Sequence, residues 1–193
     1  FLLTADVSGS VGVWDITSVT EKEGDLGPTH ALTVKGGGRQ PATLVARTSG
    51  QFVAIGEEGG QVAVVRADDA RSLFRLAGHQ AAVSALAAQG ERLLSGDVSG
   101  AIYAWDLDAR SAALHVAVGA PVRAIASAPD ARVFATVDDA GALRLWDGVT
   151  GAPLDALEGA QVTCVAFDPF DRAGERLVAG TADGTILRLV VRR

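Results

Sequence analysis

The chain has 193 residues, of which 48% are hydrophobic and 21% charged, and its formal net charge is -6. This composition is that of a folded globular chain and excludes a disordered tail. A negatively charged chain without a run of Lys and Arg argues against a nucleic-acid-binding surface. No stretch approaches the roughly 20 apolar residues that span a bilayer. We therefore predict neither nucleic acid nor a membrane as a partner.

The chain contains one cysteine, Cys164, and no asparagine. A single cysteine cannot form an internal disulfide, and no Cys/His spacing typical of zinc sites is present. We predict no metal and no other cofactor, and we expect a cytoplasmic protein from a reducing compartment. Because Phe1 is not a translation start and no signal sequence follows it, we also expect the chain to be part of a longer polypeptide.

Five glycine turns recur along the chain, each followed by a short alternating run of residues. They contain Gly9, Gly60, Gly100, Gly141 and Gly184, and the intervals between them are 51, 40, 41 and 43 residues. The longer first interval predicts an insertion. A period of about 40 to 45 residues is typical of propeller blades that end in Trp-Asp. We predict five copies, approximately residues 1–37, 38–77, 78–118, 119–158 and 159–193.

Each copy has the residue pattern of four short antiparallel strands. In the third copy, residues 92–96 lead into the glycine turn, residues 101–106 follow it, and residues 113–118 form the next apolar run. In the fourth copy, residues 122–127 supply the first strand. The period of two and the glycine turns predict hairpins. Since no amphipathic helix interrupts the pattern, we predict an all-β fold whose first and last blades are partial.

The period, the Trp-Asp pairs at Trp14, Trp105 and Trp146, and the Gly-His dipeptide that ends in His79 occur together. In these features the chain resembles the WD-repeat β-propeller family over nearly its whole length. The resemblance implies a propeller of four-stranded antiparallel blades, seven in the complete protein. It also implies that the same longer chain supplies the remaining blades. The three tryptophans are expected to be structural residues of their blades.

The resemblance further implies a buried hydrogen-bonded set within a blade, made of a histidine, a strand serine, an acid in the glycine turn and the tryptophan. In the third copy these positions are His79, Ser95 and Trp105, with Ser99 where the family has the acid. No copy then keeps the full set, which predicts that packing between blades carries the stability. A catalytic pair of His79 and Ser95 is the alternative, but no nucleophile-elbow pattern accompanies it.

An acidic residue stands three positions before the turn glycine in four of the five copies, and further acids lie beside it. Together with polar residues of the loops that open the blades, these acids are our candidate partner-binding residues: Asp6, Glu57, Glu58, Asp97, Asp138, Asp139, Asp183, Arg39 and Gln80. Two interpretations stay open. Each acid accepts hydrogen bonds from its own turn, or the acids form a ring that receives a basic segment of a partner protein.

Two longer loops are predicted at residues 16–30 and 167–176, and the second contains the aromatic contact candidate Phe170. We interpret the chain as a non-enzymatic scaffold for protein–protein interaction in a larger intracellular complex. Cytoskeletal and ciliary assemblies are examples of complexes that use such propellers. The alternative is a propeller enzyme or small-ligand binder with a site in the central channel. Against it, the first-strand runs at 122–127 and 162–167 bring no carboxylate or histidine together.

Overall fold

The computed structural model describes residues 2–5, 10–14, 30–33, 41–46, 52–66, 71–89 and 92–191, with side chains for residues 52–66, 71–88 and 92–191. The described residues form antiparallel strands joined by turns and contain no helix, which confirms the all-β prediction. Consistent with this, no membrane-spanning helix is found in the described part of the chain. The loop predicted at 16–30, apart from His30, lies outside these residues.

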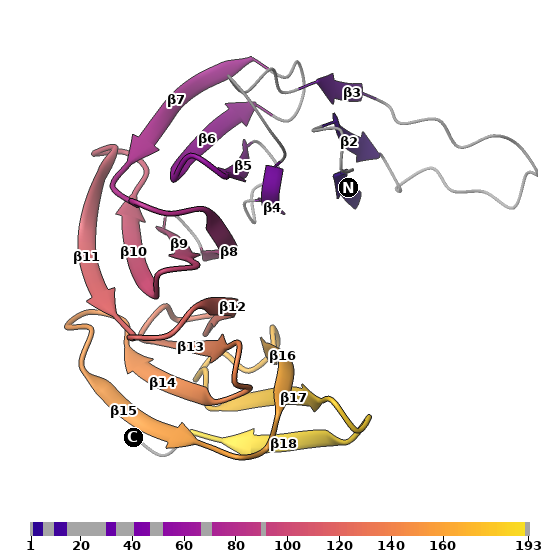
Figure 1. Ribbon diagram of the computed structural model, residues 1–193, viewed down its shortest axis with the longest axis vertical. Helices are drawn as coiled ribbons and strands as arrows, with labels where there is room; N and C mark the ends of the chain where they lie inside the picture. The colour runs from indigo at the N-terminus through magenta and orange to yellow at the C-terminus, as the bar shows by residue number, and fades with distance from the viewer. Residues whose placement is uncertain are drawn as a thin grey trace, which may run out of the picture.

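The strands form five antiparallel sheets that follow the order of the chain (Figure 1). The first sheet contains β1 (Leu2–Ala5), β2 (Ser10–Trp14) and β3 (His30–Thr33). The second contains β4 (Pro41–Ala46), β5 (Phe52–Glu57), β6 (Gln61–Arg66) and β7 (Ser72–Ala77). The third contains β8 (Val83–Gln89), β9 (Arg92–Asp97), β10 (Ala101–Asp106) and β11 (Ser111–Ala117).

The fourth sheet contains β12 (Val122–Ser127), β13 (Val133–Asp138), β14 (Leu143–Asp147) and β15 (Pro153–Leu157). The fifth contains β16 (Val162–Phe167), β17 (Arg176–Thr181) and β18 (Ile186–Val190). Each sheet falls within one of the five predicted copies, while the copy boundaries themselves stay a prediction.

The sheets follow one another around an arc, as blades of a propeller do (Figure 1). The first strands of the sheets lie on the inner side of the arc, where β8 contacts both β4 and β12, and β12 contacts β16. The fourth strands β7, β11 and β15 lie on the outer side (Figure 1). This radial order of inner and outer strands is that of a β-propeller, and it confirms the predicted fold class.

The hydrophobic core lies between neighbouring sheets, because the pleat of each strand sends alternate side chains to opposite faces. On β10, Ile102 and Ala104 pack toward the fourth sheet, whereas Trp105 packs toward the second. The strand β13 is buried at all six of its positions, since sheets cover both of its faces. A sheet covered on both sides therefore needs apolar side chains at nearly every position of its middle strands.

In the second, third and fourth sheets, the turn between the second and third strands packs against the loop that opens the next sheet. Gly100 has φ +91, and a Cβ atom there would lie 2.7 Å from the carbonyl oxygen of Ala120. Gly141 has φ +77 and would place a Cβ 2.6 Å from the Cα of Gln161. Glycine is required here by both the left-handed backbone and the close approach. These turns and the blade-opening loops consequently lie at the same end of the strands, on one face of the arc. We call this face the turn face.

Candidate functional site

Four polar side chains of the third sheet and its opening loop form one continuous buried hydrogen-bond network. The Nδ1 atom of His79 lies 2.7 Å from Asp97 Oδ2, and its Nε2 atom lies 2.6 Å from Ser95 Oγ. Trp105 donates its Nε1–H to the same Ser95 oxygen at 2.7 Å. Ser95 and Asp97 are 0% exposed and His79 is 6% exposed. The network therefore has no access to a substrate.

Every donor and acceptor of this network is satisfied when His79 is neutral. The ring then donates from Nδ1 to Asp97 and accepts at Nε2 from the Ser95 hydroxyl, whose oxygen in turn accepts from Trp105. Burial lowers the pKa of His79 below 6.5, although the carboxylate of Asp97 acts in the opposite direction. A neutral imidazole beside a charged carboxylate is the protonation state that this geometry requires.

The other oxygen of Asp97 is equally occupied by its own turn. Asp97 Oδ1 accepts the backbone N–H groups of Ser99 and Ala101 at 2.9 and 3.0 Å and the Ser99 hydroxyl at 2.6 Å. Burial would raise the pKa of the Asp97 carboxyl, but the hydrogen bonds from Ser99, Ala101 and His79 hold it below its usual value. The carboxylate is thus charged and fully coordinated inside the blade.

The prediction that no copy keeps the full hydrogen-bonded set is wrong for the third sheet. The acid was expected at Ser99, whereas the structure places it two residues earlier, at Asp97, with Ser99 donating to it. The fifth sheet shows the opposite arrangement, in which the Thr181 hydroxyl donates to Asp183. The acid and the hydroxyl have exchanged positions between the two turns. Because both orders place a carboxylate in the same turn, the third sheet holds the complete network.

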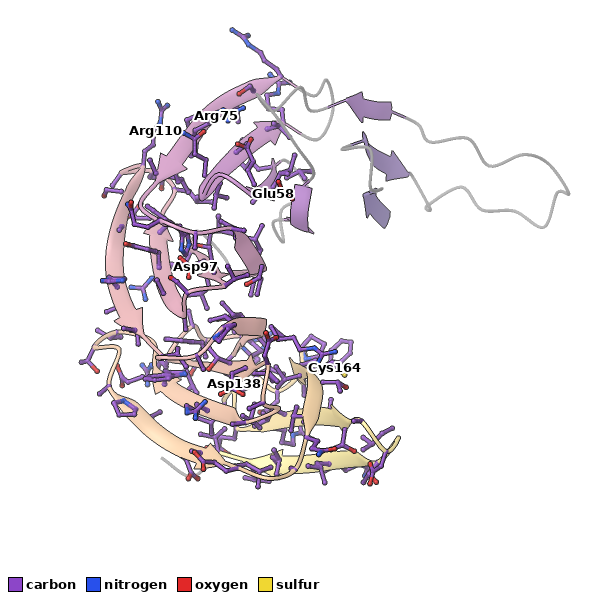
Figure 2. All side chains as sticks on the ribbon, in the orientation of Figure 1. Glu58, Arg75, Asp97, Arg110, Asp138 and Cys164 are labelled. Carbon is purple, nitrogen blue, oxygen red and sulfur yellow. The ribbon has the colours of Figure 1, made fainter. Side chains whose placement is uncertain are left out.

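In the second and fourth sheets an arginine, and not a neutral histidine, pairs with the equivalent acid. In the fourth sheet Asp138 is ion-paired with Arg144 of β14, and Trp146 donates to Thr136 at 2.9 Å. In the second sheet Glu57 Oε2 lies 2.8 Å from Arg75 Nη1 of β7. The recurring acid therefore acts within its own sheet in all three cases, paired with His79, Arg144 or Arg75 (Figure 2 labels Asp97, Asp138 and Arg75).

Burial corrects part of the predicted partner-binding set. Asp97 and Asp138 are 0% and 3% exposed and bind groups of their own sheets, so they present no charge to a partner. Glu57 is half-buried and paired with Arg75. Glu58, Asp139, Asp183 and Gln80 are exposed on the turn face. Asp6 and Arg39, together with the side chain of Trp14, lie outside the described residues and side chains.

The carboxylates that remain exposed differ in how they are used. Asp183 accepts the Thr185 N–H and the Thr181 hydroxyl, and these hydrogen bonds lower the pKa of its carboxyl. Glu58 and Asp139 have no hydrogen bond or ion pair from their carboxylates to any described residue. The interpretation that each acid serves its own turn therefore fits Asp97 and Asp183, whereas Glu58 and Asp139 are free carboxylates among the described residues of the turn face.

The loop of residues 168–176 at the end of β16 is ordered by its own carboxylates and presents Phe170. Asp171 accepts the backbone N–H groups of Glu175 and Arg176, and both Asp168 and Asp171 lie near the Arg176 guanidinium. Phe170 is 89% exposed beside a hollow of about 660 Å³ that also includes Val178 and Val190. The hollow lies on the face of the fifth sheet that no described sheet covers.

Sequence comparison finds two segments of the chain, residues 70–106 and 151–187, that match the family model described as "WD domain, G-beta repeat". These two segments of the chain are WD repeats. The first match contains the whole His79 network, and the second covers the turn in which Asp183 binds Thr181. The resemblance inferred from the repeat period and the Trp-Asp endings is therefore confirmed.

Two solved structures show the fold of these WD repeats. A chain in a crystal structure of the mitotic checkpoint complex superposes with a TM-score of 0.78 at 18% identity, covering 99% of this chain and 59% of that one. The computationally designed protein Ika8 superposes with a TM-score of 0.76 at 20% identity, covering 98% and 55% respectively. This chain thus spans between one half and two thirds of the length of both structures.

Proposed function

We propose that this WD-repeat chain is a non-enzymatic scaffold for protein–protein interaction and that its turn face receives a basic segment of a partner. The observation that carries the proposal is the pair of exposed carboxylates Glu58 and Asp139, on the turns of the second and fourth sheets, which form no ion pair with any described residue. The buried acids Asp97 and Asp138 are already hydrogen-bonded or ion-paired within their own sheets. Exposed carboxylates of one sign favour encounter with a basic segment, most strongly at low ionic strength.

The proposal is tested with the double variant Glu58→Gln/Asp139→Asn and a fluorescein-labelled peptide of alternating lysine and serine. The control variant Asp155→Asn/Glu175→Gln removes two exposed charges away from the turn face. Fluorescence anisotropy at about 50 mM and 150 mM salt should show weaker binding for the first variant only, with the larger difference at low salt. Equal affinities of the two variants would reject the turn face as the basic-segment site.

We place the scaffold in the cytoplasm, within a larger complex of the kind found in cytoskeletal or ciliary assemblies. The exposed free thiol of Cys164 supports a reducing compartment. Localisation of the tagged protein by fluorescence microscopy tests this placement. A secreted or organelle-lumenal protein would contradict it.

The rival function, an enzyme or small-ligand binder with a site in the central channel, makes a different prediction. It requires polar groups that converge from the inner strands, among which Arg123 of β12 is exposed. Substituting Arg123 by Gln would then abolish ligand binding, whereas the scaffold proposal expects no effect on capture of the basic peptide.

We also propose that further blades of the same polypeptide complete the propeller, and the uncovered face of the fifth sheet supports this. Ile186 and Val178 are 73% and 43% exposed. Counted from the turn glycines, they occupy the places of Leu143 and Ala135 in the fourth sheet, which are 2% and 0% exposed because the fifth sheet covers them. A repeat of the same kind is what buries such positions elsewhere in the chain.

Cys164 provides a probe for this cover, because it is exposed and lies on the inner strand of the fifth sheet. In a natural polypeptide that contains further blades, with any other cysteines replaced by serine, maleimide should label Cys164 much more slowly than in residues 1–193 alone. Equal labelling rates would show that the face stays uncovered.

A further inference from the structure

A hollow of about 310 Å³ lies between the second and third sheets, at the opposite end of the strands from the turn face. Its walls are apolar and come from three strands of the second sheet and from the turn between β10 and β11: Phe52, Val64, Leu73, Phe74 and Leu107. Asp108 and Arg110, both exposed, complete the lining. The volume is at the lower end of the range of about 300–1,000 Å³ that is usual for ligand pockets.

The next interface along the arc has the corresponding hollow closed. Between the third and fourth sheets only about 10 Å³ remains, and Arg92 crosses it to donate to the carbonyl of Gly148 at 3.1 Å. A Cβ atom on Gly148 would lie 2.2 Å from the carbonyl oxygen of Ala131, so only glycine fits there. The interface between the third and fourth sheets is thus a closed counterpart of the open interface between the second and third sheets.

Two residues distinguish the open hollow from the closed one. The turns after Trp105 and Trp146 are alike, since in both the aspartate that follows the tryptophan accepts two backbone N–H groups. Counted from that tryptophan, Leu107 and Arg110 stand where the fourth sheet has Gly148 and Gly151. Gly151 must lack a side chain, because a Cβ there would lie 2.7 Å from Val116. The third sheet instead carries two large side chains into this region.

Arg110 is held over the hollow, and its charge is not neutralised by any carboxylate of the described residues. Its guanidinium carbon lies 4.9 Å from the ring centre of Phe74, a cation–π contact. No described carboxylate forms an ion pair with it, including the neighbouring Asp108. Arg110 also adopts φ +54, a left-handed conformation in which the fourth sheet uses glycine at Gly151. A non-glycine residue is strained there, so Arg110 lowers the stability of the chain relative to a glycine at this position.

We propose that this hollow binds a partner peptide in which a large apolar side chain is followed closely by a carboxylate. The apolar side chain, best an aromatic one, fills the space between Phe74 and Leu107. The carboxylate binds the planar guanidinium of Arg110, which can donate two hydrogen bonds at once. The carboxylate of Asp108 accepts backbone N–H groups of the same peptide. This site is separate from the turn face and takes a ligand of the opposite charge.

The test uses two labelled peptides, acetyl-Ser-Gly-Phe-Gly-Glu-Ser amide and the same peptide with Gln in place of Glu. Their binding to the isotope-labelled protein is followed by NMR titration. We expect the Glu peptide to bind at least about tenfold more tightly, with the largest shifts at Phe74, Leu107 and Arg110. Absence of binding by the Glu peptide, equal affinity for both peptides, or shifts centred on other residues would overturn the proposal.

The decisive variant is Arg110→Gly, which restores the residue type of Gly151 and relieves the left-handed strain. It is expected to fold at least as stably as the parent chain and to lose the preference for the Glu peptide. The control Arg172→Gly removes an exposed arginine outside the hollow and should keep the preference. An unchanged preference in Arg110→Gly would refute the assignment. The turn-face variant Glu58→Gln/Asp139→Asn has no effect on this preference, so the two proposals fail separately.

Discussion

Replacing Asp97 by asparagine should destabilise the chain far more than removing a charge from the surface. The carboxylate accepts four hydrogen bonds, from the His79 ring, the Ser99 N–H and hydroxyl, and the Ala101 N–H. An amide has the same shape but only one acceptor oxygen. In either orientation its NH₂ group faces a donor, so at least one buried donor loses its acceptor.

The size of the effect follows from the burial of the network. A buried donor without an acceptor costs about 1–3 kcal/mol, and a hydrogen bond to a charged group contributes about 1.5–3 kcal/mol. Allowing for partial rearrangement, we expect a loss of about 3 kcal/mol in the free energy of unfolding. With a urea m-value of about 2–3 kcal/mol/M, the unfolding midpoint falls by about 1–1.5 M.

Urea unfolding at pH 7, followed by circular dichroism, measures this shift. The matched control is Asp139→Asn, which makes the same chemical change at an exposed carboxylate and should move the midpoint by less than about 0.3 M. If both variants gave the same midpoint, the hydrogen-bond network around His79 would contribute nothing measurable, and the argument from burial would be refuted.

Three further predictions concern single residues of the blades. Since the pKa of His79 is lowered in the folded state, its contribution to stability is complete above pH 6.5 and is lost as the pH falls below that value. In urea titrations at a series of pH values, His79→Gln should flatten the fall in unfolding free energy below pH 6.5. Gly148→Ala should lower the melting temperature by several degrees, because the added Cβ meets a backbone oxygen. The control Gly119→Ala places a Cβ in open space, so it should lower the melting temperature only through the backbone strain of its positive φ. Arg144→Leu should raise the pKa of Asp138 and lower the free energy of unfolding by about 3 kcal/mol, because it leaves a buried carboxylate without its cation. NMR titration of the Asp138 carboxyl carbon measures the pKa, and an unshifted pKa would contradict the prediction.

The fold could be predicted from local signals because they repeat. The turn glycines, such as Gly100 and Gly141, need left-handed backbone and close packing, and these requirements recur once per blade. Trp105 and Trp146 mark the ends of third strands whose other face packs on the next sheet. A periodic pattern of this kind is readable because the same physical demand returns at a fixed interval.

The candidate site was predictable only in part. The histidine, serine and tryptophan of the network can be predicted from their positions, but the position of the acid falls on Ser99, which suggests an incomplete set although Asp97 supplies the carboxylate. Counting from the tryptophan identifies a position, whereas two residues of a tight turn can place a carboxylate in the same space. The exposed candidates were also overcounted, since Asp97 and Asp138 look as polar in the sequence as Asp139 does. Burial depends on neighbouring sheets, which no single repeat contains.

By itself the sequence determined the repeat, the strand order within each blade and the resemblance to WD repeats, because these follow from local spacing and alternation. Tertiary structure alone decided which acids are buried and which side chain pairs with each one: neutral His79 from the preceding loop, Arg144 from the third strand of its sheet, and Arg75 from the outer strand of its sheet. It also decided that one interface between sheets is closed by Gly148 while its neighbour stays open beside Leu107. The space between two blades is set by side chains far apart in sequence.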